Sequence, residues 1–168
     1  MSAKVLLARI LYWFTGLKED PYELFSRIGV EEDDDILELG CAIGFHTFAL
    51  ADLAEDGKIY AVDISEEFIT YIERKSKNEG YRNIVPICED AEEIGLENKD
   101  LDKTVCFDTL HHLDDPEKGL REILDHLEPS GLFLYRDPEL SAETVLEYSE
   151  GKLVELFETK KVHVFKKG

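Results

Sequence analysis

The chain has 168 residues, with 38 acidic and 19 basic side chains and a net charge of −19 at pH 7. This length fits one domain that buries a core of its own. The charge argues against a nucleic-acid backbone or an anionic membrane surface as partner and favours a neutral or cationic small molecule. The alternative is a solvated acidic surface that only maintains solubility.

The first apolar segment, VLLARILYWF, runs from Val5 to Phe14 and contains Arg9. It is too short to cross a bilayer, and it lacks the small residues of a signal-peptide cleavage site. We expect an amphipathic helix that docks on the domain. The predicted organisation is an N-terminal helical segment over residues 1–29, followed by a domain over residues 30–168.

After residue 30 the chain alternates between strand and helix patterns. The apolar runs predict strands at 35–39, 58–64, 83–88, 102–110 and 131–137. Helices are predicted at 45–54, 65–80, 117–127 and 141–149, and a closing hairpin at 152–159 and 161–167. Ser65 and Gly80 are predicted to cap one helix, and Pro86 favours an edge strand.

This alternation predicts an α/β fold, a parallel sheet with helices on both faces. Ligands of such sheets bind outside the carboxyl ends of the strands, where the strand order reverses. The candidate site residues are therefore those that follow each strand. They are Gly40 to Gly44, Asp63, Asp90, Phe107 to His112, and Asp137.

The turn after the first strand distinguishes between two kinds of nucleotide site. A dinucleotide turn reads Gly-x-Gly-x-x-Gly. Here Ala42 and Phe45 stand at its second and third glycine positions, which leaves Gly40, Ala42 and Gly44 as small residues. Glu38 precedes the turn and would repel a pyrophosphate. A ligand with an ammonium or sulfonium group fits better, and an NAD-type oxidoreductase is the disfavoured alternative.

Four segments in order resemble class I S-adenosylmethionine-dependent methyltransferases, most closely the small-molecule branch that includes quinone-biosynthesis C-methyltransferases. They are ILELGCAIG (36–44), IYAVDIS (59–65), VPICEDAEEI (85–94) and DKTVCFDTLHHLDDPEKGLREILDHLEPSGLFLY (102–135). The resemblance covers about residues 30–168. The chain departs from it at Ala42, where the family more often has Gly, and is short after the fifth strand.

The resemblance implies a Rossmann-like doubly wound fold, with a mostly parallel seven-stranded sheet in the order 3-2-1-4-5-7-6 and a reversed last strand. It also implies an S-adenosylmethionine site. Glu38 would hold the methionine ammonium group, with a turn acid as the alternative. Gly40, Cys41, Ala42 and Gly44 would form a backbone loop against the methionine and ribose.

Further cofactor contacts follow from the same resemblance. Asp63 would accept hydrogen bonds from the ribose hydroxyls, and Ile64 would pack on adenine, with core packing as its alternative. Asp90 and Ala91 would meet the adenine edge, with a plain acidic loop as the alternative. Phe107 and Asp108 would lie near the methionine chain and the methyl group. An Asp at a buried strand end needs a cation, or else an ordinary hydrogen-bonded turn.

Histidines and aromatic residues supply the remaining candidates. His111 and His112 are candidate catalytic bases, with a structural role as the alternative. His46 could approach the cofactor carboxylate, although we expect it to face solvent. The family resemblance also implies that residues 1–29 form a lid, in which aromatic rings can enclose a sulfonium. Those rings belong to Tyr12, Trp13, Phe14 and Tyr22, and coverage of a helix face is the alternative.

The implied activity is methyl transfer from S-adenosyl-L-methionine to a small-molecule acceptor by in-line displacement, and the alternative is a non-catalytic sensor or partner subunit. No metal site is expected, because no Cys and His cluster has ligand spacing. The three cysteines, Cys41, Cys88 and Cys106, predict buried thiols and a cytoplasmic location. The N-terminal helix is a candidate homodimer interface, and neither nucleic acid nor a membrane span is expected.

Overall fold

A computed structural model describes residues 3–16, 19–97 and 100–168, with side chains for residues 3–10 and from residue 19 onward. The strands are β1 (Ile36–Leu39), β2 (Ile59–Val62), β3 (Ile84–Ile87), β4 (Leu101–Phe107), β5 (Leu127–Arg136), β6 (Leu153–Thr159) and β7 (Val162–Lys167). The helices are α1 (Ala3–Gly16), α2 (Pro21–Ile28), α3 (Thr47–Leu53), α4 (Glu66–Glu79), α5 (Pro116–His126) and α6 (Ala142–Tyr148), with the 3-10 turn η1 (Leu110–His112).

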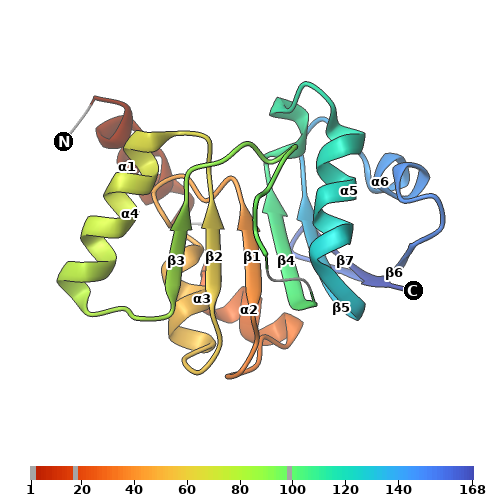
Figure 1. Cartoon of the computed structure of the whole chain (residues 1–168), viewed down its shortest axis with the longest axis horizontal. Helices are drawn as coiled ribbons and strands as arrows, with labels where there is room; N and C mark the ends of the chain where they lie inside the picture. Colours follow the sequence, from red (N-terminus) through yellow and green to blue (C-terminus); the bar gives the residue numbers. More distant parts are fainter. Residues whose placement is uncertain (1–2, 17–18, 98–99) are drawn as a thin grey trace.

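In the described part of the chain the strands form one seven-stranded sheet in the order β3-β2-β1-β4-β5-β7-β6 (Figure 1). The first five strands pair in parallel, and β7 runs antiparallel to both β5 and β6. The predicted fold class, strand order and reversed last strand are confirmed. Pro86 lies on the edge strand β3 opposite Ala61, where its missing N–H leaves no central ladder bond unmade.

The central strands separate two apolar cores. Leu37 and Leu39 of β1 pack on the side of α5 and α6, while Ile36 packs on the side of α2 and α3. Every residue of β1 and β2 is buried, as expected for parallel strands that are covered on both faces. The sheet therefore holds the carboxyl ends of β1, β2 and β4 in fixed positions.

Helix α1 docks on the domain, as the sequence predicts, and lies beside α4 at the β3 edge (Figure 1). Val5 and Ala8 are buried against Ile43, with Phe68 and Tyr71 of α4 packed around them. The opposite side of α1 exposes Leu6, Leu7 and Ile10. None of the helices in the described ranges has the length and apolarity needed to cross a membrane.

Several predicted boundaries were wrong. The strand predicted at 58–64 ends at Val62, and the strand predicted at 102–110 ends at Phe107, ahead of the 3-10 turn η1. Helix α3 begins at Thr47 rather than at residue 45, because the turn that contains Gly44 (φ +80°) continues through His46. Helix α5 passes into β5 at Leu127 without the expected loop. A register shift in the β4–β5 pairing, together with Ser130 in the left-handed region (φ +74°), accommodates this early start.

Candidate functional site

A cavity of about 550 Å³ lies at the carboxyl ends of β1, β2 and β4, where the strand order reverses between β1 and β4. Ten of the residues predicted for the site line it: Gly40, Ala42, Asp63, Ile64, Asp90, Ala91, Phe107, Asp108, Thr109 and His112. Glu38, Cys41, Gly44 and His111 are not among its lining residues. The fold thus gathers segments from four loops around one space.

The glycine turn passes close to the loop that follows β4. Gly40 has φ +72°, and a Cβ at that position would lie 2.1 Å from Oγ1 of Thr109. Ala42 also has a left-handed backbone, with φ +47°, at the position where the family more often has Gly. A larger residue therefore does not fit at Gly40, which lines the cavity.

Asp63 joins the glycine turn to the end of β2. Its Oδ2 accepts a hydrogen bond from the backbone N–H of Ala42 at 3.0 Å, and its Oδ1 accepts one from the N–H of Ser65 at 2.8 Å. The carboxylate is half-buried and lines the cavity. Asp63 therefore fixes the loop and keeps lone pairs for a ligand hydroxyl.

The predicted adenine residues lie on the same cavity wall. Ile64 is 73% exposed, so the alternative that it packs in the core was wrong. Asp90 is also exposed, and its Oδ1 accepts a hydrogen bond from the N–H of Glu92 at 2.9 Å. An exposed isoleucine beside a cavity is an apolar surface that a flat ring could cover.

Glu38, Cys41 and Gly44 lie behind the cavity wall, where all three are buried. Oε2 of Glu38 accepts a hydrogen bond from the hydroxyl of Thr47 at 2.5 Å. Burial raises the pKa of Glu38 to about 8, and the charge of Asp63 acts in the same direction. A cation bound nearby would favour the ionised form of this carboxyl.

The end of β4 differs from its prediction. Phe107 is buried, but Asp108 is exposed and has φ +52°, so the expectation of a buried carboxylate was wrong. Its counter-charge is Arg136, whose Nη2 lies 3.3 Å from Oδ2 of Asp108. Arg136 also places its guanidinium 4.7 Å from the centre of the Phe107 ring. Sequence reasoning missed Arg136, although its place at the end of β5 was a usable signal.

The two adjacent histidines have different environments. Nδ1 of His111 lies 2.9 Å from Oδ2 of Asp137, a carboxylate whose side chain has 0% exposure. Burial opposes ionisation of Asp137, but hydrogen bonds from the backbone of Glu139, Leu140 and His111 and from the His111 ring lower its pKa. His112 lines the cavity with its ring centre 3.9 Å from that of His111. Only His112 is placed to reach a ligand directly.

His46 is 7% exposed, so the expectation that it faces solvent was wrong. Its ring meets those of Phe25, Phe45 and Phe107 edge-on, at centre distances of 5.8, 4.9 and 5.1 Å. Nε2 of His46 lies 3.2 Å from Oε1 of Glu19, a residue that sequence reasoning did not single out. This pair ties the segment before α2 to the end of the glycine turn.

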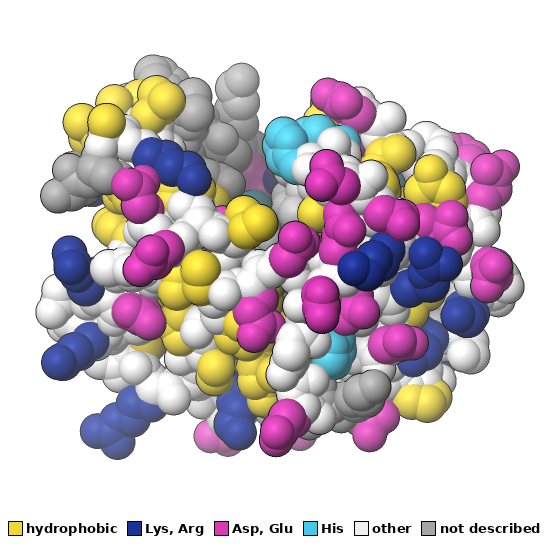
Figure 2. All heavy atoms as spheres, turned by 45° about the horizontal axis from the view of Figure 1, so that its top comes forward, with side chains coloured by type: hydrophobic (Ala, Val, Ile, Leu, Met, Phe, Trp, Pro, Cys, Tyr) yellow, Lys and Arg dark blue, Asp and Glu magenta, His cyan; other side chains and the backbone are white. Residues whose placement is uncertain are grey.

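The cavity is acidic. Its charged lining residues within the described ranges are Lys4 and six acids: Asp63, Glu89, Asp90, Glu92, Asp108 and Asp114. Nζ of Lys4 donates to the hydroxyl of Ser65 at 2.8 Å and lies 4.5 Å from the centre of the Phe68 ring. Figure 2 shows acidic side chains distributed over this face of the molecule. The site therefore disfavours phosphate and favours a cation.

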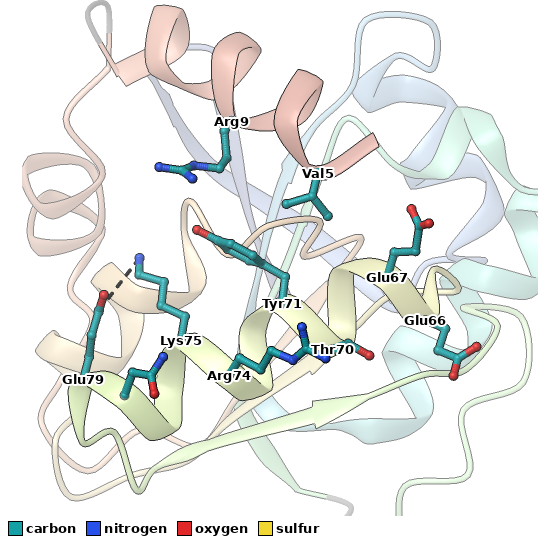
Figure 3. Close-up of a pocket in the computed structure, with 10 residues that line it drawn as sticks. Val5, Arg9, Glu66, Glu67, Thr70, Tyr71, Arg74, Lys75 and Glu79 are labelled. Atoms are coloured by element: carbon teal, nitrogen blue, oxygen red, sulfur yellow. Dashed lines mark ion pairs between the residues drawn. The ribbon is translucent and has the colours of Figure 1, made fainter. Parts of the chain in front are cut away.

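A second hollow of about 790 Å³ lies between α1 and α4 (Figure 3). Arg9 and Val5 of α1 face Tyr71 and Lys75 of α4 across it. It is larger than the first cavity, but none of the predicted site residues lines it. Its lining includes no residue from the carboxyl ends of the strands, so we assign the ligand site to the smaller cavity.

The predicted aromatic lid falls largely on side chains that the structure does not describe. The side chains of Tyr12, Trp13 and Phe14 lie outside the described residues. The hydroxyl of Tyr22 donates to Oδ2 of Asp52 at 2.6 Å, and Tyr22 is not among the lining residues of the cavity. Among the described side chains of α1, Lys4 lines the cavity. Of the three cysteines, Cys41 and Cys106 are buried as predicted, whereas Cys88 is exposed.

Comparison with known proteins finds a matching family and several relatives. A family model described as a methyltransferase domain matches residues 31–164. The malonyl-[acyl-carrier protein] O-methyltransferase of Bacillus anthracis is 31% identical over 100 residues, which are 60% of this chain and 36% of that protein. A probable S-adenosylmethionine-dependent methyltransferase of Mycolicibacterium smegmatis is 26% identical over 164 residues, 91% of this chain and 60% of that protein.

A solved structure shares the fold. The crystal structure of a SAM dependent methyltransferase from Aquifex aeolicus matches with a TM-score of 0.73 at 23% identity, over 88% of each chain. The chain spans 36% and 60% of the lengths of the two curated relatives above. The likeness therefore concerns the domain that carries the cavity.

Proposed function

This chain belongs to the methyltransferase-domain family, and on that basis we propose that it transfers the methyl group of S-adenosyl-L-methionine to a small-molecule acceptor. The observation that carries the proposal is the acidic cavity, which unites the glycine turn, Asp63 and the loop at Asp90 at the switch point of the sheet. A sulfonium cofactor without phosphate suits this charge.

The proposed contacts follow the placement of each group. Asp63 would bind the ribose hydroxyls, Ile64 would cover adenine, and Asp90 with the backbone of Ala91 would meet its polar edge. Glu38, Cys41 and Gly44 support these contacts from behind the wall. We propose that Glu38 acts on the methionine ammonium group by its charge. These buried residues also hold the turn in place.

The proposed chemical step needs little from the protein beyond alignment. The bond between sulfur and the methyl carbon breaks, its electron pair stays on sulfur, and the acceptor's electron pair forms the new bond to carbon. Holding the two reactants in line lowers such barriers by about 7–11 kcal/mol. His112 would take the proton of a protonated acceptor, with His111 held beside it by Asp137.

Residues 1–29 are proposed as a lid, because α1 places Lys4 at the cavity. A homodimer through α1 is proposed from its exposed Leu6, Leu7 and Ile10. Sedimentation of the wild type and of Leu7→Glu tests the dimer, which the substitution should dissociate.

Three unpaired cysteines support a reducing compartment, and we propose the cytoplasm.

Calorimetric titration of the purified chain with S-adenosylmethionine tests the function. We expect saturable binding at one site, followed by formation of S-adenosylhomocysteine when acceptors are screened by mass spectrometry. No heat from the wild type would contradict the proposal. Binding without turnover across the acceptor panel would favour the second candidate, a non-catalytic sensor or a subunit that needs a partner.

A further inference from the structure

Four side chains from separate segments meet beside the cavity, and one of them, Asp108, lines it. Glu19 lies before α2, His46 ends the glycine turn, Asp108 follows β4, and Arg136 ends β5. Oε2 of Glu19 lies 2.6 Å from Nη1 of Arg136, and its Oε1 lies 3.2 Å from Nε2 of His46. Nη2 of Arg136 lies 3.3 Å from Asp108. Glu19 thus joins the segment before α2 to the glycine turn and to the end of β5.

The charge states of this cluster follow from its contacts. The hydrogen bond from His46 lowers the pKa of Glu19, with Arg136 acting in the same direction, so Glu19 is ionised. Burial lowers the pKa of His46, which favours the neutral ring. Because an ionised carboxylate only accepts, the proton of His46 resides on Nε2. The guanidinium of Arg136 is always positive, so Glu19 supplies it with a little-exposed counter-charge.

Arg136 of this cluster packs against Phe107, and both Phe107 and Asp108 line the cavity. The guanidinium of Arg136 is 4.7 Å from the centre of that ring, and its side chain is only 17% exposed. A guanidinium in this position would repel a sulfonium bound in the cavity. The side chain of Glu19 is 13% exposed, so its opposing charge is little screened by solvent.

We propose that Glu19 is a charge-balancing residue that neutralises Arg136 beside the cavity-lining Phe107 and thereby strengthens the binding of a sulfonium in the cavity. This inference rests on the proposed cofactor. It assigns Glu19 a role in discriminating between the charged cofactor and its neutral thioether product. The N-terminal segment then contributes to the site through electrostatics as well as through coverage.

The test compares binding of S-adenosylmethionine with binding of S-adenosylhomocysteine by calorimetry. A unit charge roughly 10 Å away, at an effective dielectric constant of about 20, changes an affinity by about tenfold or somewhat more. Salt reduces this effect. We expect Glu19→Gln to weaken the binding of the sulfonium ligand by about three- to tenfold more than it weakens the binding of the thioether. Loss of packing alone would weaken both ligands equally.

Arg136→Met provides an independent variant with the opposite expectation. Removing the guanidinium should strengthen the binding of the sulfonium relative to that of the thioether by a similar factor. The double variant should return the ratio of the two affinities toward that of the wild type. Glu23→Gln is the matched control, because Glu23 also pairs with cations, Arg27 and Lys160, but lies on α2 outside the cavity lining. It should leave the ratio unchanged.

The outcomes separate this inference from the proposed function. If the wild type binds neither ligand, the proposed cofactor is wrong. If the wild type binds both but neither Glu19→Gln nor Arg136→Met changes their affinity ratio, the charge-balancing role is wrong. If Glu19→Gln does not fold, Arg136→Met alone decides, because its expected effect has the opposite sign.

Discussion

Thr47 donates its hydroxyl to Oε2 of Glu38 across 2.5 Å, and the two buried residues flank the glycine turn from β1 and α3. No other hydrogen bond to the Glu38 side chain occurs among the described residues. Burial therefore dominates, and it raises the pKa of Glu38 to about 8. A cation bound nearby would therefore stabilise the ionised form of this carboxyl.

The first prediction concerns stability as a function of pH. The folded-state pKa of Glu38 lies above its unfolded value of 4.5. The stability that the protonated carboxyl adds to the folded state is therefore fully present below pH 4.5, and it is lost as the pH rises toward about 8. Glu38→Gln removes this dependence. Between pH 5 and 8, the free energy of unfolding of the wild type should fall relative to the variant by a few kcal/mol.

Urea unfolding of the cofactor-free protein at both pH values measures this difference. The solvent-exposed Glu93 provides the control, since Glu93→Gln should follow the wild type at each pH. If the free energies of unfolding of the wild type and of Glu38→Gln change in parallel between pH 5 and 8, Glu38 is ionised in the folded protein.

The second prediction concerns Asp63, which supports the turn and faces the cavity. Asp63→Ala removes the acceptors of the Ala42 and Ser65 N–H groups, so it should lower the free energy of unfolding by about 1–3 kcal/mol. It should also weaken the binding of S-adenosylhomocysteine at least about tenfold, because two ribose hydroxyls lose a charged acceptor. Calorimetry and urea unfolding measure the two effects.

Asp63→Asn separates those effects, because its amide oxygen retains part of the acceptor capacity. It should keep most of the stability and still lose affinity. The exposed Asp56→Asn is the control and should change neither quantity. Unaltered affinity in Asp63→Asn would refute a ribose contact.

The third prediction compares two glycines with left-handed backbones. Gly29 has φ +92°, and a methyl group added there would meet nothing within 4 Å, whereas at Gly40 the methyl would lie 2.1 Å from Thr109. Gly29→Ala should cost about 1 kcal/mol of backbone strain. Gly40→Ala should cost at least about 2 kcal/mol more, because overpacking adds to the strain.

Thermal and urea unfolding of both variants test this difference. Adding Thr109→Ala to Gly40→Ala should recover part of the loss by removing the hydroxyl that the methyl meets. Equal destabilisation of the two single variants would show that the contact with Thr109 does not constrain the turn.

The fourth prediction concerns the His111–Asp137 pair. Asp137→Asn removes the negative charge beside Nδ1 of His111 and weakens the preference for one ring tautomer, so kcat should fall about 10- to 100-fold if the histidines assist proton removal. The Kd for S-adenosylmethionine should change less than about twofold, because Asp137 does not line the cavity. Steady-state methyl transfer with an acceptor found by screening measures kcat.

The exposed Asp125 of α5 provides a matched substitution for this experiment, and Asp125→Asn should retain wild-type turnover. A shift of the acidic limb of the kcat profile in Asp137→Asn would support the role in proton removal. If Asp137→Asn keeps the kcat and the pH profile of the wild type, the His111–Asp137 pair has a structural role only.

The sequence alone predicted the fold and most of the cavity. Alternating apolar segments specify buried parallel strands, so the positions at their carboxyl ends converge on one edge, and Gly40, Asp63, Asp90 and Phe107 could be identified there. Pro86 marked the edge strand because it lacks an N–H. These are local properties, which depend on the order and type of neighbouring residues.

The tertiary structure alone decided which side chains share charge and burial. His46 was expected in solvent but is buried and pairs with Glu19, and Asp108, expected at a buried strand end, is exposed and pairs with Arg136. Ion pairs and burial depend on long-range packing, which local periodicity does not encode. The sequence determined where a ligand can bind, and the packing determined the electrostatic environment that it meets.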